Sequence, residues 1–346
     1  MLVEGVGAEG QERLARGHAV IVGCGALGCG VADLLARAGI GRLTIIDRDV
    51  VEETNLQRQC LLDERHLREG LPKAEAARRR LAEINSGVRV EAHVADLHAG
   101  SLATLLPEIA GEPGPGATGG ATVLIDGTDN FPTRLLLNDL AVRQGIPYIY
   151  AGVLATRAMV LAVVPGSGRA CLRCILPEPP APGSVATCDT AGVLGPAVGV
   201  ATSLQAAEAM KVLLGLADRV SADLVEIDVW SGAMRCIPAA GLRDPACGCC
   251  GRGDFVWLDP SRQPPTATLC GRDAVQVMAR TGGAADLAAI GARLARVGRV
   301  EANAYLVRFA APEGVTITLF RDGRALVGGV ESVERARAVV DRYVGA

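Results

Sequence analysis

Residues 19–28 read AVIVGCGALG, and this stretch decides the fold of the first half of the chain. A short apolar run, typical of a buried strand, ends in Gly23, Gly25 and Gly28, and a helical stretch begins near Leu27. Glycines in this spacing make a tight turn and let phosphate groups approach the N-terminus of the following helix. The pattern predicts a nucleotide site, although similar glycine loops occur where nothing binds.

A second apolar run, residues 43–46, ends at Asp47, about 20 residues beyond Gly28. An acid at this distance accepts a hydrogen bond from a nucleotide ribose. The glycine loop and Asp47 alone fit an NAD-dependent oxidoreductase as well as an enzyme that uses ATP.

Further charged side chains favour ATP. Arg58 lies between two amides in TNLQRQ, Lys73 follows in LPK, and a later strand ends in IDGTDN with Asp126 and Asp129. Attack on a phosphate brings anion to anion, so it requires cations and a metal-binding acid, whereas hydride transfer needs neither. Singly, Arg58 and Lys73 fit solvated surface charges equally well, and Asp129 fits a turn. Together they predict phosphate chemistry.

At this point the chain resembles a known family. The segments GCGALG, IIDRDVVEETNLQRQ, LPK and IDGTDN occur in the order found in ThiF/MoeB-type (HesA/MoeB/ThiF) adenylyltransferases, which are related to the ubiquitin-activating enzymes. The resemblance covers roughly residues 5–250, and the TNLQRQ and TDN segments carry most of its specificity.

The resemblance implies an activity and a role for each matching residue. The enzyme would use MgATP to adenylate the C-terminal glycine of a ubiquitin-like sulfur-carrier protein ending in Gly-Gly, with release of pyrophosphate. A sulfur donor protein would then convert the acyl-adenylate to a thiocarboxylate, for thiamine, molybdopterin or a related cofactor. Members of the family pair as homodimers. By similarity Asp47 holds the ribose, Asp129 the magnesium ion, and the ATP phosphates are contacted by Asn55, Arg58, Gln59 and Lys73.

One departure from the family concerns the N-terminus. Family members begin with an arginine-containing segment that reaches the neighbouring subunit's ATP site, whereas this chain opens MLVEGVGAEGQERL. Arg13 and Arg16 do not match that arginine. Since an arginine at a transferring phosphate contributes about 10³-fold or more in rate, a catalytically weak scaffold that binds a ubiquitin-like partner stays open as an alternative.

Eleven cysteines give a second strong signal. In a chain without a secretion signal they point to metal binding or catalysis rather than to disulfides. Cys171 and Cys174 form one C-x-x-C pair, and Cys247 and Cys250 form another. Two such pairs predict a closed structural zinc site, with Cys249 competing for the fourth position. Redox-active or inert buried thiols are the alternative.

Cys188 follows a proline-rich loop and precedes a helix that Pro196 opens. A helix N-terminus nearby lowers the pKa of a thiol and raises its reactivity. The family has a cysteine here that some members use covalently. A small buried thiol without a chemical role explains the residue equally well.

Composition and organisation agree with a cytoplasmic enzyme. A net charge of −3 gives no sign of nucleic-acid or anionic-membrane binding, and no N-terminal apolar run or membrane-spanning stretch is present. Residues 1–250 alternate strands with helices, which predicts an α/β fold with a doubly wound, mostly parallel, Rossmann-like sheet. The expected helices are 27–38, 73–84, 101–110, 133–143 and 197–214, and the expected strands are 43–46, 88–93, 122–126, 146–150, 158–164 and 223–229.

After a linker at 251–266, residues 267–346 read as a small α+β module. Two helical stretches are expected first, then strands at 305–310, 314–320 and 324–328 and a final helix from Ser332 to Tyr343. A turn at Asp322-Gly323 joins the last two strands. The module has neither a sulfurtransferase-type cysteine loop nor a Gly-Gly tail, so we expect it to serve recognition or oligomerisation.

Overall fold

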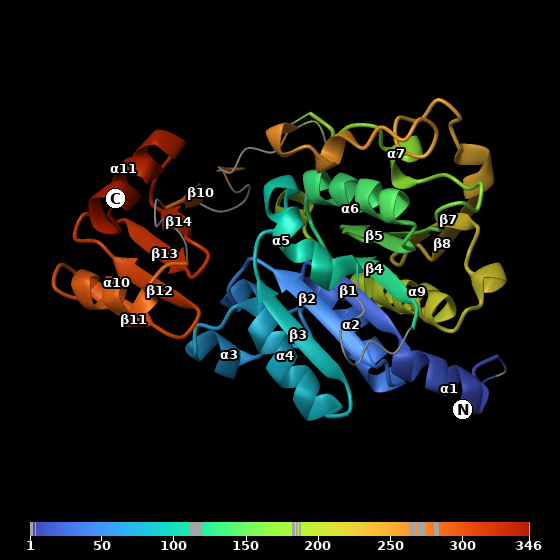
Figure 1. The fold of residues 1–346 in the computed structure, drawn as a ribbon, viewed down its shortest axis with the longest axis horizontal. Coiled ribbons are helices and arrows are strands. Elements are labelled where there is room, and N and C mark those ends of the chain that lie inside the picture. The colour runs from blue at the N-terminus through green and yellow to red at the C-terminus, as the bar shows by residue number, and fades with distance from the viewer. Residues whose placement is uncertain are drawn as a thin grey trace. The chain divides into compact units, whose positions relative to one another are not determined.

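The computed structural model describes residues 3 and 5–345, apart from 111–119, 182–183, 185, 187, 263–266, 269–273 and 280–283 (Figure 1). The chain divides into two compact units, residues 1–263 and 264–346. Among the described helices, none combines the length and the apolarity needed to cross a bilayer.

The first unit is built on an eight-stranded sheet with strand order β3-β2-β1-β4-β5-β6-β7-β8. Neighbouring strands are parallel from β3 to β5 and antiparallel from β5 to β8. The strands are β1 (His18–Val22), β2 (Arg42–Asp47), β3 (Arg89–Val94), β4 (Thr122–Asp126), β5 (Tyr148–Leu154), β6 (Arg157–Val163), β7 (Asp223–Asp228) and β8 (Ala233–Pro238).

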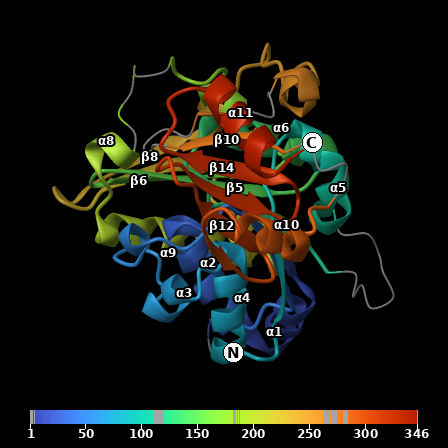
Figure 2. The ribbon, with the colours of Figure 1, turned by 90° about the vertical axis from the view of Figure 1, so that its left-hand side faces the viewer.

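Helices cover both faces of this sheet, as Figures 1 and 2 show: α5 and α6 lie on one face, and α2, α4 and α9 on the other. Their bounds are α1 (Gly7–Arg16), α2 (Ala26–Ala38), α3 (Glu64–Arg68), α4 (Lys73–Ile84), α5 (Ala99–Ala110), α6 (Phe131–Gln144), α7 (Leu172–Ile175), α8 (Cys188–Ala191) and α9 (Gly195–Leu213). The doubly wound, mostly parallel fold is therefore confirmed.

The central strand β1 explains why an unbroken apolar run predicts this architecture. All five of its residues are buried, since helices shield both of its faces. Strand β1 pairs with β2 on one side and with β4 on the other, so the crossover connections leave it in opposite directions. This switch point brings the carboxyl ends of β1, β2 and β4 to one edge, where open α/β sheets bind their ligands.

Strand β8 was not predicted from the sequence. It forms one edge of the sheet and all six of its residues are exposed, so it has no buried face to give a periodic apolar signal. At the other end of the unit, Trp257 falls in the stretch expected to be a linker. Its side chain is only 6% exposed and belongs to the apolar cluster under α6.

The second unit has a six-stranded antiparallel sheet with order β11-β12-β13-β14-β10-β9. The buried side chains of one sheet face form a core with α10 and α11. Its elements are β9 (Ala267–Thr268), β10 (Ala274–Met278), α10 (Leu287–Leu294), β11 (Arg299–Ala302), β12 (Leu306–Ala310), β13 (Thr316–Phe320), β14 (Arg324–Gly328) and α11 (Val333–Tyr343).

The expectation of two helical stretches ahead of β12 was wrong. Of the residues described there, Leu287–Leu294 form one helix, and Ala274–Met278 form a strand that pairs with β14. Val275 and Val277 alternate into the core, and β-branched residues at a spacing of two favour a strand.

Candidate functional site

The glycine loop packs directly against the turn that follows β4. Gly23 has φ +86°, and a Cβ there would lie 2.6 Å from the carbonyl carbon of Gly127. A Cβ on Gly28 would overlap the carbonyl oxygen of Gly23. Both positions therefore require glycine, whereas a Cβ on Gly25 would meet only an ordinary contact. Gly25 is the N-cap of α2 and makes no side-chain cap, so the first N–H groups of this helix lie at the sheet edge.

Asp47, at the end of β2, ties this loop to its neighbour. Its Oδ2 accepts a hydrogen bond from the backbone N–H of Cys24 at 2.6 Å, and its Oδ1 accepts one from the N–H of Asp49 at 2.7 Å. Burial raises the pKa of the Asp47 carboxyl, while the positive charge of Lys73 opposes that rise. Each carboxylate oxygen has further lone pairs for a ligand hydroxyl.

Lys73 is the first residue of α4, and its side chain is only 6% exposed. Its Nζ lies 3.2 Å from Oδ2 of Asp49, and its backbone N–H donates to the Asp49 carbonyl at 2.9 Å. A buried ammonium is costly without a counter-charge, so this ion pair fixes the lysine beside Asp47.

The TNLQRQ segment folds as a 3₁₀ turn (Glu53–Asn55) and the residues after it. Asn55 is buried, and its Oδ1 accepts the N–H of Glu52 at 3.1 Å, which caps the turn. Gln59 is also buried, and within the described residues its Oε1 has no hydrogen-bond partner. Arg58 is half-buried and donates to the carbonyl of Thr54 at 2.7 Å. These three side chains are close in sequence, but no direct contact joins them to Lys73 or Asp129 among the described interactions.

The two acids that follow β4 have different environments. Asp126 is fully buried and accepts from the Thr128 hydroxyl at 2.7 Å and from Tyr148 Oη at 2.6 Å. Burial raises the pKa of Asp126, and the charge of Arg134 opposes that rise. Asp129 is exposed at the turn. Asp126 thus shapes the turn, and Asp129 is the acid that is open to a cation.

Arg48 shows that Asp129 and Asp47 share one electrostatic environment. Burial lowers the pKa of Arg48, but the carboxylates of Asp96, Asp49, Asp129 and Asp47 outweigh this effect and raise it above its usual value. Its guanidinium lies 3.3 Å from Asp96. The structure therefore brings together three of the expected site residues, namely Asp47, Lys73 and Asp129.

Arg134 is a functional candidate that the sequence reasoning missed. Its Nη2 donates to the carbonyl of Thr128 at 2.8 Å, and its Nε lies 3.7 Å from Asp126. The guanidinium also lies over the rings of Phe131 and Tyr150, at 5.6 and 5.4 Å from their centroids. An arginine inside the otherwise apolar run FPTRLLL was the available signal, because a buried cation needs such partners.

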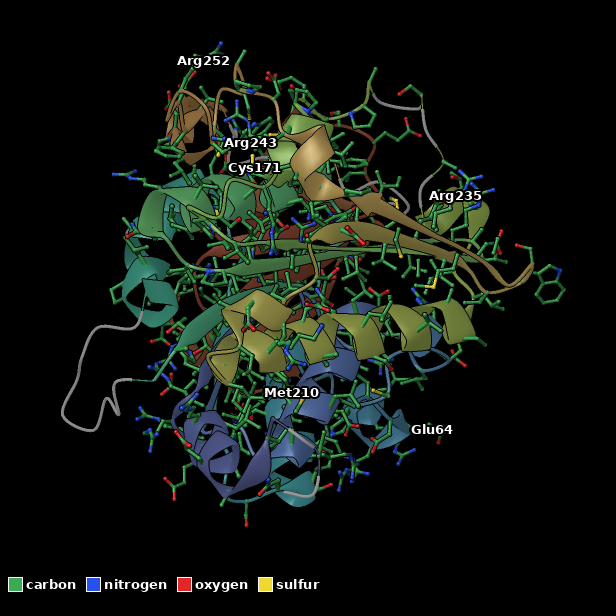
Figure 3. All side chains as sticks on the ribbon, turned by 90° about the vertical axis from the view of Figure 1, so that its right-hand side faces the viewer. Glu64, Cys171, Met210, Arg235, Arg243 and Arg252 are labelled. Carbon is green, nitrogen blue, oxygen red and sulfur yellow. The ribbon has the colours of Figure 1, made fainter. Side chains whose placement is uncertain are left out.

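The cysteine pairs meet on the α6 side of the sheet, where Figure 3 labels Cys171. The sulfurs of Cys171, Cys174, Cys247 and Cys250 all lie within 4.8 Å of one another. Three of the separations are 4.0 Å (171–174), 3.8 Å (171–247) and 3.4 Å (174–250). Tetrahedral Zn²⁺ with Zn–S bonds of about 2.3 Å needs sulfurs about 3.8 Å apart. The donor set and its spacing fit zinc.

Cys249, the competing fourth ligand, lies outside this group of four. It is 1% exposed, and its sulfur accepts a hydrogen bond from Asn138 Nδ2 at 3.3 Å. For Cys188, the backbone starts the short helix α8, and its side chain lies outside the described part of the chain.

Comparison with known proteins agrees with this arrangement. Residues 1–249 match the model of the ThiF family. The chain is 39% identical to the sulfur carrier protein ThiS adenylyltransferase of Bacillus subtilis over 98% of this chain and 96% of that protein. It is 37% identical to a sulfur carrier protein adenylyltransferase of Thermus thermophilus over 72% of this chain and 88% of that protein.

A solved structure shares the fold. The crystal structure of E. coli MccB with ATP superposes with a TM-score of 0.58 at 25% sequence identity, covering 70% of this chain and 69% of that one. The family match covers the whole unit that carries the glycine loop, the Asp129 turn and the four cysteines. The chain belongs to the ThiF family.

Proposed function

We propose that this protein is an ATP-dependent adenylyltransferase that activates the C-terminal glycine of a ubiquitin-like sulfur-carrier protein ending in Gly-Gly. The observation that carries the proposal is the meeting of the glycine loop, Asp47, Lys73 and Asp129 at one sheet edge, in a chain that resembles a ThiS adenylyltransferase along nearly its full length. The pathway would be that of thiamine, molybdopterin or a related cofactor.

The chemistry assigns a role to each part of this edge. An oxygen of the carrier's terminal carboxylate attacks the α-phosphorus of ATP, and the bond from that phosphorus to the bridging oxygen breaks, so pyrophosphate leaves with the bonding electrons. The open N–H groups of α2 and the glycine loop face the phosphates. Asp47 orients the ribose, and Lys73 and Arg58 neutralise charge together with the amides of Asn55 and Gln59.

Magnesium would be held by Asp129, and when bound it would neutralise the leaving pyrophosphate. The exposed carboxylate supports this assignment, since Asp126 is occupied by Thr128 and Tyr148. Arg134 would keep the turn in place by holding the Thr128 carbonyl.

We further propose that Cys171, Cys174, Cys247 and Cys250 hold one structural Zn²⁺. With four thiolates the site would be closed to substrate, so the metal would stabilise the fold rather than take part in adenylation. A sulfur donor protein would complete thiocarboxylate formation, with Cys188 as a candidate for the covalent step. The protein would act as a homodimer in the cytoplasm.

Pyrophosphate exchange tests the proposal. Labelled pyrophosphate should enter ATP only when a carrier with an intact Gly-Gly end and Mg²⁺ are present. A carrier that lacks its last glycine is the matched control. Carrier binding without exchange would identify a scaffold instead of an enzyme. A rise in the melting temperature with NAD but not with MgATP would favour an oxidoreductase.

A further inference from the structure

Two adjacent polar residues lie in the middle of α6, beneath the cysteine cluster. Asn138 and Asp139 are both 0% exposed, and the helix around them is apolar. Asparagine and aspartate are poor helix formers, and burying their side chains is costly unless every polar atom finds a partner. Their position therefore needs an explanation in the contacts that they make.

The Asn138 carboxamide contacts both C-x-x-C segments at once. Its Oδ1 accepts the backbone N–H of Leu172 at 2.8 Å, next to Cys171. Its Nδ2 donates to Cys249 Sγ at 3.3 Å, between the ligands of the second pair. One side chain thus connects two segments that are more than 70 residues apart in sequence.

Asp139 makes a parallel set of contacts. Its two carboxylate oxygens accept from Arg173 Nη1 at 3.1 and 3.0 Å, and its Oδ2 also accepts the N–H of Trp257 at 3.1 Å. The same Arg173 nitrogen donates to the carbonyl of Asp254 at 2.8 Å. A Cβ on Gly248 would lie 2.8 Å from Arg173 Nη2, so the guanidinium packs tightly against the second cysteine segment.

From these contacts we infer that Asn138 and Asp139 are positioning residues that hold the two cysteine pairs in metal-binding register, and that Cys249 anchors the second pair rather than binding the metal. Without them, closing the long loop between Cys174 and Cys247 would be left to the metal alone, which lowers its affinity. Partners behind the ligands are worth about 10- to 100-fold in metal affinity at other sites.

The test uses the full-length chain and Zn²⁺ alone, so it does not depend on ATP or a carrier. Asn138→Leu replaces the carboxamide by an apolar group of similar size, and Asp139→Ala removes the carboxylate. We expect each variant to bind one Zn²⁺ about 10- to 100-fold more weakly, measured by competition with a chromogenic chelator at 25 °C. Leu137→Ala is the matched control, since Leu137 is buried on the opposite side of the same helix. It should lower the melting temperature without changing zinc affinity.

Two further variants keep the inference testable if Asn138→Leu fails to fold. Asn138→Asp keeps the acceptor for Leu172 and loses the donor to Cys249, so its zinc affinity should be intermediate. Cys249→Ala should keep the Co²⁺ spectrum of four thiolates and weaken metal binding in the same direction as Asn138→Asp. Unchanged zinc affinity in the Asn138 and Asp139 variants, or a three-thiolate Co²⁺ spectrum in Cys249→Ala, would overturn it.

Discussion

The sheet edge at the glycine loop and the cysteine cluster on α6 solve opposite problems with buried polar groups. At the sheet edge, Asp47 and Lys73 are tied by a few backbone and charge contacts, and Asp129 stays exposed. At the cluster, four cysteines face one another and Asn138 and Asp139 satisfy the segments that carry them. The first region is left incomplete for a ligand, whereas the second is closed. Damage should therefore appear as lost chemistry in one region and as lost stability in the other.

The largest expected effect breaks the closed region. Cys171→Ser should remove the zinc and lower the free energy of unfolding by more than about 4 kcal/mol, because the loss of a structural metal is among the most costly single changes. Zinc content by mass spectrometry and urea unfolding measure both effects. The exposed Cys236→Ser is the control and should change neither. A zinc-free variant with an unchanged unfolding midpoint would remove the contrast between the regions.

The next effect breaks the open region. Asp129→Ala should slow carrier-dependent pyrophosphate exchange by 10²–10³-fold, on the order of the several kcal/mol that a catalytic metal contributes. Its melting temperature should stay within about 1 °C of wild type, since an exposed carboxylate adds little to stability. Asp33→Ala, on the surface of α2, serves as the control. Undiminished exchange in Asp129→Ala would exclude this acid from magnesium binding.

A third measurement uses a group that belongs to neither region. Burial, aided by the charge of Arg42, lowers the pKa of His18 to about 4. The unfolded chain takes up this proton near pH 6.5 and the folded chain does not, so stability falls as the pH drops from 6.5 towards 4. Between pH 7 and 5 the loss should be about 2 kcal/mol.

Urea unfolding of His18→Gln at the two pH values checks this expectation, because most of the loss should disappear. His98→Gln, on a half-buried histidine, should keep the pH dependence of wild type. Equal pH dependence in wild type and His18→Gln would mean that acid sensitivity arises elsewhere, for example in one of the two regions compared above.

The smallest expected effect concerns the second unit. A chain that ends at Gln263 should retain exchange within about twofold at saturating carrier and should remain a homodimer, because every residue proposed for adenylation lies before residue 135. Light scattering and exchange assays on both chains measure this. A monomeric, inactive truncation would show that the second unit completes the active assembly.

The predictable parts of this protein are those with a local signal. The glycine loop, Asp47 and the two C-x-x-C pairs announce themselves by spacing, because tight turns and thiolate ligands demand fixed residue types. Strand β10 was missed because its short apolar run fits a helix or a strand equally well until its partner β14 is known.

Long-range partners had no such signal. The buried pairing of Arg134 with Asp126 and the contact of Asn138 with Cys249 depend on segments that meet only in the folded chain. The choice between Cys249 and Cys250 was open in sequence for the same reason. It is decided in the structure by the direction of two neighbouring side chains.

The exposed edge strand β8 has a consequence for handling the protein. An uncovered edge offers unpaired N–H and C=O groups to any other chain in extended conformation, and this favours aggregation. Here Met234 and Trp230 are 60% and 79% exposed, so the region is also apolar. Arg235, labelled in Figure 3, places a positive charge on this strand, and charged side chains are a common safeguard against such stacking. Replacing it with valine should therefore make concentrated solutions of the protein turbid sooner on warming.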